Sequence, residues 1–239
     1  SAASDVYKRQ IPKWSQFLDA HPTPASCADA SLGDVLRLWQ GLGYPRRARN
    51  LHATATRVTA EHGGHLPDDL DALLALPGVG PYTARAVLAF AFERDVAVVD
   101  TNIARVLART VGERLTPKRA QAAADRLVPT GDGWLWNQVL MDLGATTCRP
   151  MPMCDECPVA SACAWRVAGN AEPDPAVGSA GVSSGQAPFE GSDRQARGRL
   201  LRSLTDGPRP VDDVDGRILA SLLADDLVAV VDGQVGLPG

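Results

Sequence analysis

Four cysteines stand close together in the chain, with the spacing C-x5-C-x2-C-x5-C. They are Cys148, Cys154, Cys157 and Cys163. Thiols at this density are cross-linked, metallated or open to oxidation, so they indicate a built site. Four thiolates can hold zinc or an iron–sulfur cluster. Zinc ribbons usually carry two C-x2-C pairs and this run has one, but the spacing alone leaves both metals open.

A glycine-rich turn, Leu76-Pro77-Gly78-Val79-Gly80, lies between two segments with helical patterns. Glycines let backbone amides approach a phosphate, and the N-terminus of the following helix adds a favourable dipole. Such a unit contacts the DNA backbone and reads no sequence. An ordinary helical turn is the alternative reading, since the motif is only five residues long. The candidate phosphate contacts are Gly78, Val79, Gly80, Tyr82 and Thr83.

Basic residues gather in one stretch of an otherwise acidic chain. Residues 37–57 hold five arginines and no acid, and Arg46, Arg47 and Arg49 form a basic patch suited to phosphates. A solvated helix face is the alternative. The net charge of −4 comes mostly from the C-terminal part, because residues 170–239 carry 6 basic and 11 acidic side chains, against 18 and 17 in residues 1–169.

The elements that must position these residues are predicted to be helices. Hydrophobic residues make up 45% of the chain but aromatic residues only 5%, so the core is expected to be mostly Ala, Leu and Val, which favours helices. The periodicity predicts helices over 32–40, 48–62, 68–76, 82–92, 102–111, 117–127 and 135–143.

Residues 169–190 are rich in Gly, Ser, Pro and Ala and are predicted to be a linker. Helices are expected over 192–204 and 215–224, followed by a β-hairpin that turns at Asp232-Gly233. Helices followed by a short hairpin indicate a small winged-helix-like α+β unit over 191–239.

No apolar run is long enough to cross a bilayer and no signal peptide is visible, so we expect a cytoplasmic, nucleoid-associated protein with no membrane partner. A reducing compartment argues against a disulfide framework. Cys27, alone in a Pro/Ala/Ser stretch, is interpreted as a small structural residue.

Several motifs, in order, resemble the helix–hairpin–helix DNA glycosylases that carry an iron–sulfur cluster, and most closely their adenine DNA glycosylase (MutY-type) branch. The motifs are Leu38–Tyr44, Arg46–Leu51, Leu76–Ala84, Val98–Val106, Asn137–Ala145 and the cysteine run. This resemblance covers about Ile11 to Trp165. It implies a mainly α glycosylase domain over 11–168 with a [4Fe–4S] cluster held by the four cysteines.

The resemblance also implies roles for single residues. Asp100 would face the deoxyribose of an extruded adenine and stabilise oxocarbenium character at C1′, although a helix N-cap also explains an acid there. Asn102 would orient Asp100, and Arg105 would face the site or a phosphate. Tyr44 would be the wedge beside 8-oxoguanine. The implied partner is duplex DNA with A:8-oxoguanine or A:G mispairs, bound by a monomer; the implied contacts outside the glycine turn are Tyr44, Arg46, Arg49 and Arg105.

The related endonuclease III-like enzymes have a lysine in the hairpin that forms a Schiff base with the sugar. This chain has Tyr82 there, and none of its three lysines lies near the hairpin in the sequence. Without an amine nucleophile, base removal is expected to be monofunctional. The alternatives are an endonuclease III-like lyase, a mismatch thymine glycosylase, a non-catalytic DNA-binding module and a zinc-binding structural protein.

Three departures from the branch are visible. Its general-acid glutamate is expected just before Ile11, but Ser1–Gln10 does not resemble that helix and is interpreted as a foreign leader; no glutamate precedes Glu61. We therefore expect weak DNA binding and slow adenine removal. The first cysteine gap is one residue shorter than usual and holds a single basic residue, Arg149. Residues 191–239 are too few for the Nudix-like domain of many relatives and resemble the tail of short forms.

Overall fold

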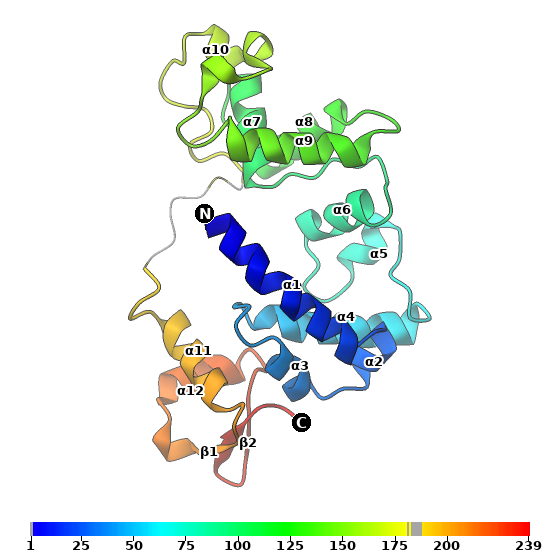
Figure 1. The fold of residues 1–239 in the computed structure, drawn as a ribbon, viewed down its shortest axis with the longest axis vertical. Helices are drawn as coiled ribbons and strands as arrows, with labels where there is room; N and C mark the ends of the chain where they lie inside the picture. Colours follow the sequence, from blue (N-terminus) through cyan, green and yellow to red (C-terminus); the bar gives the residue numbers. More distant parts are fainter. Residues whose placement is uncertain (1, 181, 183–187) are drawn as a thin grey trace. The chain divides into compact units, whose positions relative to one another are not determined.

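The computed structural model describes residues 2–180, 182 and 188–239, with side chains from Gln10 onward (Figure 1). Contacts divide the chain into two units. The first comprises Ser1–Pro67, Leu76–Gly78 and Ala187–Gly239, and the second comprises Asp68–Ala75 and Val79–Gln186. The domain ranges expected from the sequence stay a prediction, because the packing groups the C-terminal segment with the N-terminal helices.

The N-terminal part of the first unit is helical, with α1 (Ala2–Ala20), α2 (Pro24–Ala28), α3 (Leu32–Leu38) and α4 (Arg46–Glu61). The last two match expected helices. The first two were not expected, because Pro12 interrupts the pattern of α1 and α2 has only five residues. The short α2 is stabilised by a capping box in which Thr23 and Ser26 satisfy each other's amides.

The C-terminal part of this unit is a small α+β fold. It contains α11 (Asp193–Ser203), β1 (Arg209–Pro210), α12 (Gly216–Leu223), β2 (Ala229–Val231) and β3 (Gln234–Gly236). The three strands form an antiparallel sheet in the order β1-β3-β2. Asp232 and Gly233, with φ of 50° and 73°, form the two-residue turn that the sequence predicts.

One apolar core joins the two parts of the first unit. Val35 and Ala48 of the N-terminal helices belong to the same buried cluster as Leu201, Leu222 and Val235. Burying a large apolar side chain stabilises a fold by about 1.5–3 kcal/mol. The C-terminal segment is therefore part of the fold that contains α3 and α4.

The second unit is built around one buried helix. Its helices are α5 (Leu70–Leu74), α6 (Pro81–Phe90), α7 (Thr101–Val111), α8 (Pro117–Leu127), α9 (Gly133–Thr146) and α10 (Ala164–Val167). Helix α7 packs against α8, α9 and α10 (Figure 1). Seven consecutive residues of α7, from Ile103 to Arg109, are buried. The mainly α class predicted from the sequence is confirmed, and within the described residues no helix has both the length and the apolar character needed to cross a bilayer.

Residues 171–180, which we call the strap, differ from the linker expected there. Ala176 and Ser179 are buried, and Ser179 Oγ accepts a hydrogen bond from the amide of Leu115 at 3.0 Å. The amide of Ala180 donates to the Leu115 carbonyl at 2.9 Å, and Arg114 Nε donates to the Gly178 carbonyl at 2.7 Å. The strap is thus bound along the α7–α8 connection. Residues 181 and 183–187 of the expected linker lie outside the described residues.

The glycine turn between α5 and α6 is formed by a backbone that requires glycine at one of its two positions. Gly78 has φ of 72°, and a Cβ there would lie 2.1 Å from Asn50 Nδ2. The turn is held by Thr54, whose hydroxyl donates to the Pro77 carbonyl at 2.9 Å. Gly80, the N-cap of α6, has φ of −93°, and a Cβ there would meet no atom within 4 Å.

Replacing Gly78 by alanine is therefore expected to destabilise the protein by about 2 kcal/mol, because the left-handed backbone and the contact with Asn50 both oppose a side chain. Gly80→Ala is the matched control and should change the unfolding free energy by less than about 0.5 kcal/mol. Urea unfolding of the two variants measures both values. Equal stabilities would show that the turn tolerates a Cβ at either position.

Candidate active site and metal centre

Asp100 caps the N-terminus of α7. Its Oδ1 accepts a hydrogen bond from the Ile103 amide at 2.7 Å, and its Oδ2 lies 3.3 Å from Asn102 Nδ2, which donates to it. The capping role considered from the sequence is present. It leaves the carboxylate half-buried rather than enclosed, so the same group can face a ligand.

The extended segment that leads into Asp100 is held by a buried amide. Asn137 of α9 is 1% exposed; its Oδ1 accepts from the Val98 amide at 2.9 Å, and its Nδ2 donates to the Val96 carbonyl at 2.9 Å and the Gly133 carbonyl at 2.8 Å. A buried side-chain amide whose oxygen and nitrogen are both hydrogen-bonded fixes the positions of the groups that it contacts. Asn137 therefore determines where the chain enters α7.

Arg105 was expected to face the site or a phosphate, and its contacts agree with the first alternative. It is 5% exposed, and burial lowers its pKa. Its Nη2 donates to Asn102 Oδ1 at 2.8 Å and to the Gly144 carbonyl at 2.5 Å, and its Nε donates to the Cys148 carbonyl at 2.6 Å. A buried guanidinium must satisfy its donors, and these carbonyls do so. Arg105 therefore holds Asn102, which in turn contacts Asp100.

Gly144 allows this arrangement to form. A Cβ at Gly144 would lie 2.6 Å from Asn102 Cβ and 2.9 Å from the Asn102 backbone. Only glycine at this point of α9 lets the helix approach the first turn of α7 so closely. Gly144 belongs to the Asn137–Ala145 motif, and the packing supplies a physical reason for a glycine in it.

Tyr82, in the first turn of α6, lies near Asp100. Burial and the negative charge of Asp100 both raise the pKa of the Tyr82 hydroxyl, so it stays protonated at neutral pH. Tyr82 lines a hollow of about 420 Å³ together with Arg85, Val99 and Lys118 of α8. The fold thus brings a lysine to the same hollow as Tyr82, although the two are far apart in the sequence. The amides of Gly80, Tyr82 and Thr83 begin α6 without acceptors among the described residues, as expected for a phosphate contact.

In the first unit, Tyr44 stands in the loop before α4. It is 55% exposed and has φ of 48°, a conformation that is uncommon for a tyrosine and typical of functional loops. The Arg47 guanidinium lies 5.3 Å from the centre of its ring. An exposed ring held in this way is compatible with the wedge role.

The basic patch on α4 is partly neutralised within the same unit. Arg46 pairs with the buried Asp225 at 2.5 Å. Arg49 donates to the Asp225 carbonyl at 2.8 Å and lies 3.4 Å from the Asp226 carboxylate. Asp225 is 5% exposed and also pairs with Arg197. Hydrogen bonds from Arg46 and Arg197 hold its pKa below the usual range despite burial. Arg46 and Arg49 therefore also serve to attach the C-terminal part to α4.

The four cysteines line a single apolar hollow that also includes Arg109 and Trp165. All four are free thiols rather than disulfides. Among the described residues no three Cys, His, Asp or Glu side chains are close enough to bind one metal ion. Four cysteine sulfurs around one hollow are a donor set that suits an iron–sulfur cluster, and the same set also suits zinc.

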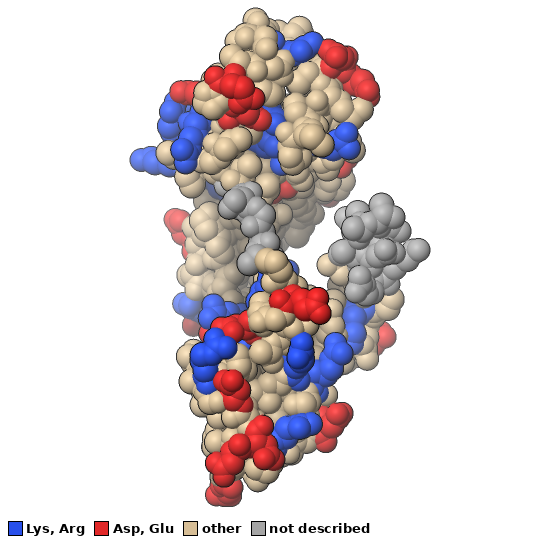
Figure 2. Space-filling view, turned by 90° about the vertical axis from the view of Figure 1, so that its left-hand side faces the viewer, with Lys and Arg blue, Asp and Glu red and all other residues tan. Residues whose placement is uncertain are grey.

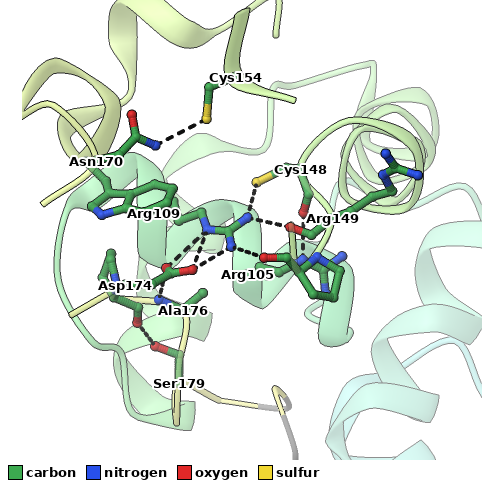
Figure 3. A network of polar contacts seen from close by, with 12 residues as sticks. Arg105, Arg109, Cys148, Arg149, Cys154, Asn170, Asp174, Ala176 and Ser179 are labelled. Carbon is green, nitrogen blue, oxygen red and sulfur yellow. Dashed lines mark hydrogen bonds and ion pairs between the residues drawn. The ribbon is translucent and has the colours of Figure 1, made fainter. Parts of the chain in front are cut away.

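Arg109 of α7 is the buried cation beside this hollow (Figure 3). It is 2% exposed; Nη1 donates to Cys148 Sγ at 3.4 Å and to the Arg149 carbonyl at 2.7 Å, and Nη2 donates to the Pro150 carbonyl at 3.0 Å. Its Nε and Nη2 contact the Asp174 carboxylate, the latter at 2.6 Å. The Trp165 ring lies 4.9 Å away. A second donor, Asn170 Nδ2, lies 3.4 Å from Cys154 Sγ.

Sequence reasoning missed Arg109 and Asp174. Arg109 was one basic residue of a predicted helix, and Asp174 belonged to the predicted linker. The available signal was an acid in a Pro- and Ala-rich stretch after the last cysteine. Burial raises the pKa of Asp174, but hydrogen bonds from Arg109 and the Ala176 amide outweigh it and hold the pKa below the usual value.

A carboxylate that caps a buried helix, a glycine turn before it and a cysteine loop after it occur here in one order along one chain. This is the order of motifs that the resemblance to helix–hairpin–helix DNA repair proteins predicts. Residues 2–130 match the HhH-GPD superfamily of base excision DNA repair proteins, and the chain belongs to this family. The match begins at residue 2, within the segment interpreted as a foreign leader, so the origin of that segment stays a prediction.

Individual relatives are adenine DNA glycosylases. The chain is 42% identical over 251 residues to that of Mycobacterium tuberculosis (strain ATCC 25618 / H37Rv), covering 97% of this chain and 80% of the relative. It is 41% identical over 161 residues to the human adenine DNA glycosylase, covering 64% of this chain and 30% of the relative. Among solved structures, a thermostable thymine-DNA glycosylase superposes with a TM-score of 0.62 at 30% identity, covering 66% of this chain and 76% of that one. The protein in an endonuclease III–DNA complex shares the fold, with a TM-score of 0.59 at 23% identity, covering 66% of this chain and 76% of that one.

The pair between the strap and α7 generates a stability prediction. Asp174→Ala leaves the Arg109 cation buried without its carboxylate, so we expect a loss of about 3 kcal/mol at pH 7. Asp155→Ala is the control: its pair with Arg166 is exposed on both sides and contributes less than about 1 kcal/mol. Urea unfolding measures both.

The same pair predicts a pH dependence. Because the pKa of Asp174 is lowered in the folded state, its contribution is complete above its unfolded pKa of 3.8 and is lost as the pH falls through the folded value. The difference in unfolding free energy between the parent and the Asp174→Ala variant should therefore become smaller below about pH 4. An equal difference at pH 7 and pH 3 would contradict this account.

Proposed function

We propose that this protein is a monofunctional DNA glycosylase that hydrolyses the N-glycosidic bond of adenine mispaired with 8-oxoguanine or guanine in duplex DNA. The observation that carries the proposal is the half-buried Asp100 carboxylate, held by the Ile103 amide and Asn102 at the start of α7. The adenine DNA glycosylases of mycobacteria, similar over 97% of the chain, support adenine as the base.

Asp100 supplies negative charge where positive charge develops. Breaking the bond to adenine builds oxocarbenium character at C1′, and an oriented carboxylate stabilises it without reorganising. The hydrogen bonds from the Ile103 amide and Asn102 fix the orientation, and Arg105 fixes Asn102. Asn102 and Arg105 are positioning residues in this proposal, and Asp100 is the catalytic one.

Tyr82 supports hydrolysis without strand cleavage. A protonated phenol beside Asp100 can donate a hydrogen bond but cannot form an imine with the sugar. Lys118 lines the same hollow and is the one amine there among the described residues. Borohydride trapping on DNA with an abasic site tests this point: no Lys118-dependent cross-link is expected.

Duplex DNA is bound in this proposal by groups that read no sequence. The free amides at the start of α6 suit a phosphate, and the exposed Tyr44 ring suits stacking where a base has left the helix. Base flipping is required because the glycosidic bond is inaccessible in stacked DNA.

A [4Fe–4S] cluster would be held by Cys148, Cys154, Cys157 and Cys163. When bound, it supplies structural cross-linking of this loop, since hydrolysis of the glycosidic bond involves no electron transfer. Arg109 and Asn170 direct N–H groups at two of these sulfurs, and both hydrogen bonds would stabilise the negative charge of a thiolate there.

Asp100→Asn tests the catalytic assignment. Asparagine caps helices as well as aspartate does, so stability should be unchanged while the single-turnover rate of adenine release falls by about 100-fold or more. Asp215→Asn makes the same change at the N-cap of α12 and should leave the rate unaltered. Adenine release that does not depend on Asp100 would contradict the proposal.

Metal analysis tests the cofactor. Protein purified without oxygen is expected to contain iron and sulfide and to show a broad visible absorption band that bleaches on reduction. Cys154→Ser should lower the iron content while Cys27→Ser should not, because Cys27 is buried in the first unit. Stoichiometric zinc without iron would contradict the proposal.

A further inference from the structure

Helix α11 has one face that is rich in arginine and exposed. Helical periodicity places Arg194, Gly198, Arg199 and Arg202 within about 140° of arc, and all four are exposed. Leu200 and Leu201, outside this arc, and the C-cap residue Leu204 pack against the core. We call the four exposed residues the arginine face.

Several other arginines of this unit are engaged with acids. Arg46 and Arg197 pair with Asp225, Arg57 pairs with Glu61, and Arg217 pairs with Asp193. By contrast, no ion pair with a described residue involves Arg199 or Arg202. Figure 2 views the side on which α11 lies in Figure 1, where basic and acidic side chains occur interspersed. Arg199 and Arg202 therefore carry positive charge that no described acid pairs with.

Gly198 gives an independent indication of a partner. Glycine is among the poorest helix formers, yet Gly198 lies inside α11 with no atom of a described residue within 4 Å of a Cβ and no positive φ. Neither packing nor backbone conformation requires it. A glycine on an exposed helix face is explained when another molecule must approach the backbone closely.

Helix α12, the other helix of this α+β part, does not offer such a surface. Helix α12 buries Ile218, Leu219 and Leu222 in the core. Exposed acidic residues precede it at Asp212, Asp213 and Asp215. Polyanions are repelled by these charges, so α11 offers a nucleic acid the more favourable approach to this part of the chain.

We propose that the arginine face of α11 binds the phosphate backbone of double-stranded DNA, with Gly198 allowing the helix to approach it closely. The proposal rests on the proposed function in taking duplex DNA as the partner. Arg194 and Arg202 lie eight residues apart, about 12 Å along the helix. Duplex DNA carries one charge per about 1.7 Å of its axis, so Arg199 and Arg202, which have no ion pair with a described residue, can each meet a phosphate.

The test measures the affinity of the full chain for an undamaged duplex at several salt concentrations. Each phosphate contact contributes about 0.9 to the slope of log K against log salt. Replacing Arg199 and Arg202 by alanine together should lower the slope by about 1.8. The affinity advantage of the parent should then shrink about 12-fold between about 50 and 200 mM salt. Arg57→Ala removes one charge that Glu61 already compensates, and should leave the slope unchanged.

Gly198→Ala separates docking from folding. It should raise the melting temperature by about 2 °C, because alanine is the better helix former, and yet weaken DNA binding. Gly216→Ala places a methyl group on α12, also in open space, and should not weaken binding. An unchanged slope in the arginine variant, or full affinity in Gly198→Ala, would overturn the proposal.

The outcome is distinguishable from a failure of the proposed function. Asp100→Asn should abolish adenine release and keep the parent salt slope, whereas the arginine variant should change the slope. If adenine release were absent from the parent but the arginine variant still lost slope, the arginine face would stand and the catalytic assignment would fall.

Discussion

Two guanidinium groups are buried on one side of α7, and a buried cation without partners costs several kcal/mol. Arg109 satisfies this demand with Asp174, two backbone carbonyls and a cysteine sulfur, and Arg105 with Asn102 and the Gly144 and Cys148 carbonyls. Segments far apart in the sequence must therefore meet at α7. The carboxylate at the start of that helix and the cysteine loop beside its end are held by the same set of contacts.

Arginines have three different uses in this chain, and burial separates them. On α7, Arg105 and Arg109 are buried and donate hydrogen bonds to segments distant in the sequence. On α4, Arg46 and Arg49 attach the C-terminal part through Asp225 and Asp226, while that part contributes its leucines to a shared core. On α11, Arg194, Arg199 and Arg202 are exposed to solvent, whereas Leu200 and Leu201 of the same helix pack against the core. A count of basic residues along the chain mixes these uses, which explains why net charge says little about partners here.

Much of the helical framework could be predicted, since α8 begins at Pro117 and α7 ends before Gly112 where cap residues indicate it. The tight turn at Asp232-Gly233 follows from local chemistry for the same reason. Asp100 could be assigned because its motif is contiguous. The function of Arg105 could not, because most of its acceptors are backbone carbonyls that any sequence supplies. Nor could the strap, whose composition resembles a linker and whose order depends on Asp174 meeting Arg109, 65 residues away.

Helix α7 has a consequence for how such chains can change. Side chains at consecutive helical positions differ by about 100°. Deleting or inserting one residue between Asn102 and Arg109 would turn one of the two buried arginines, Arg105 or Arg109, away from its acceptors while leaving the other in place. Surface loops absorb changes of length, as at Gly63-Gly64, where a side chain would meet open space. The number of residues between Asp100 and Arg109 should therefore stay constant in any related protein that keeps Arg105 and Arg109 buried.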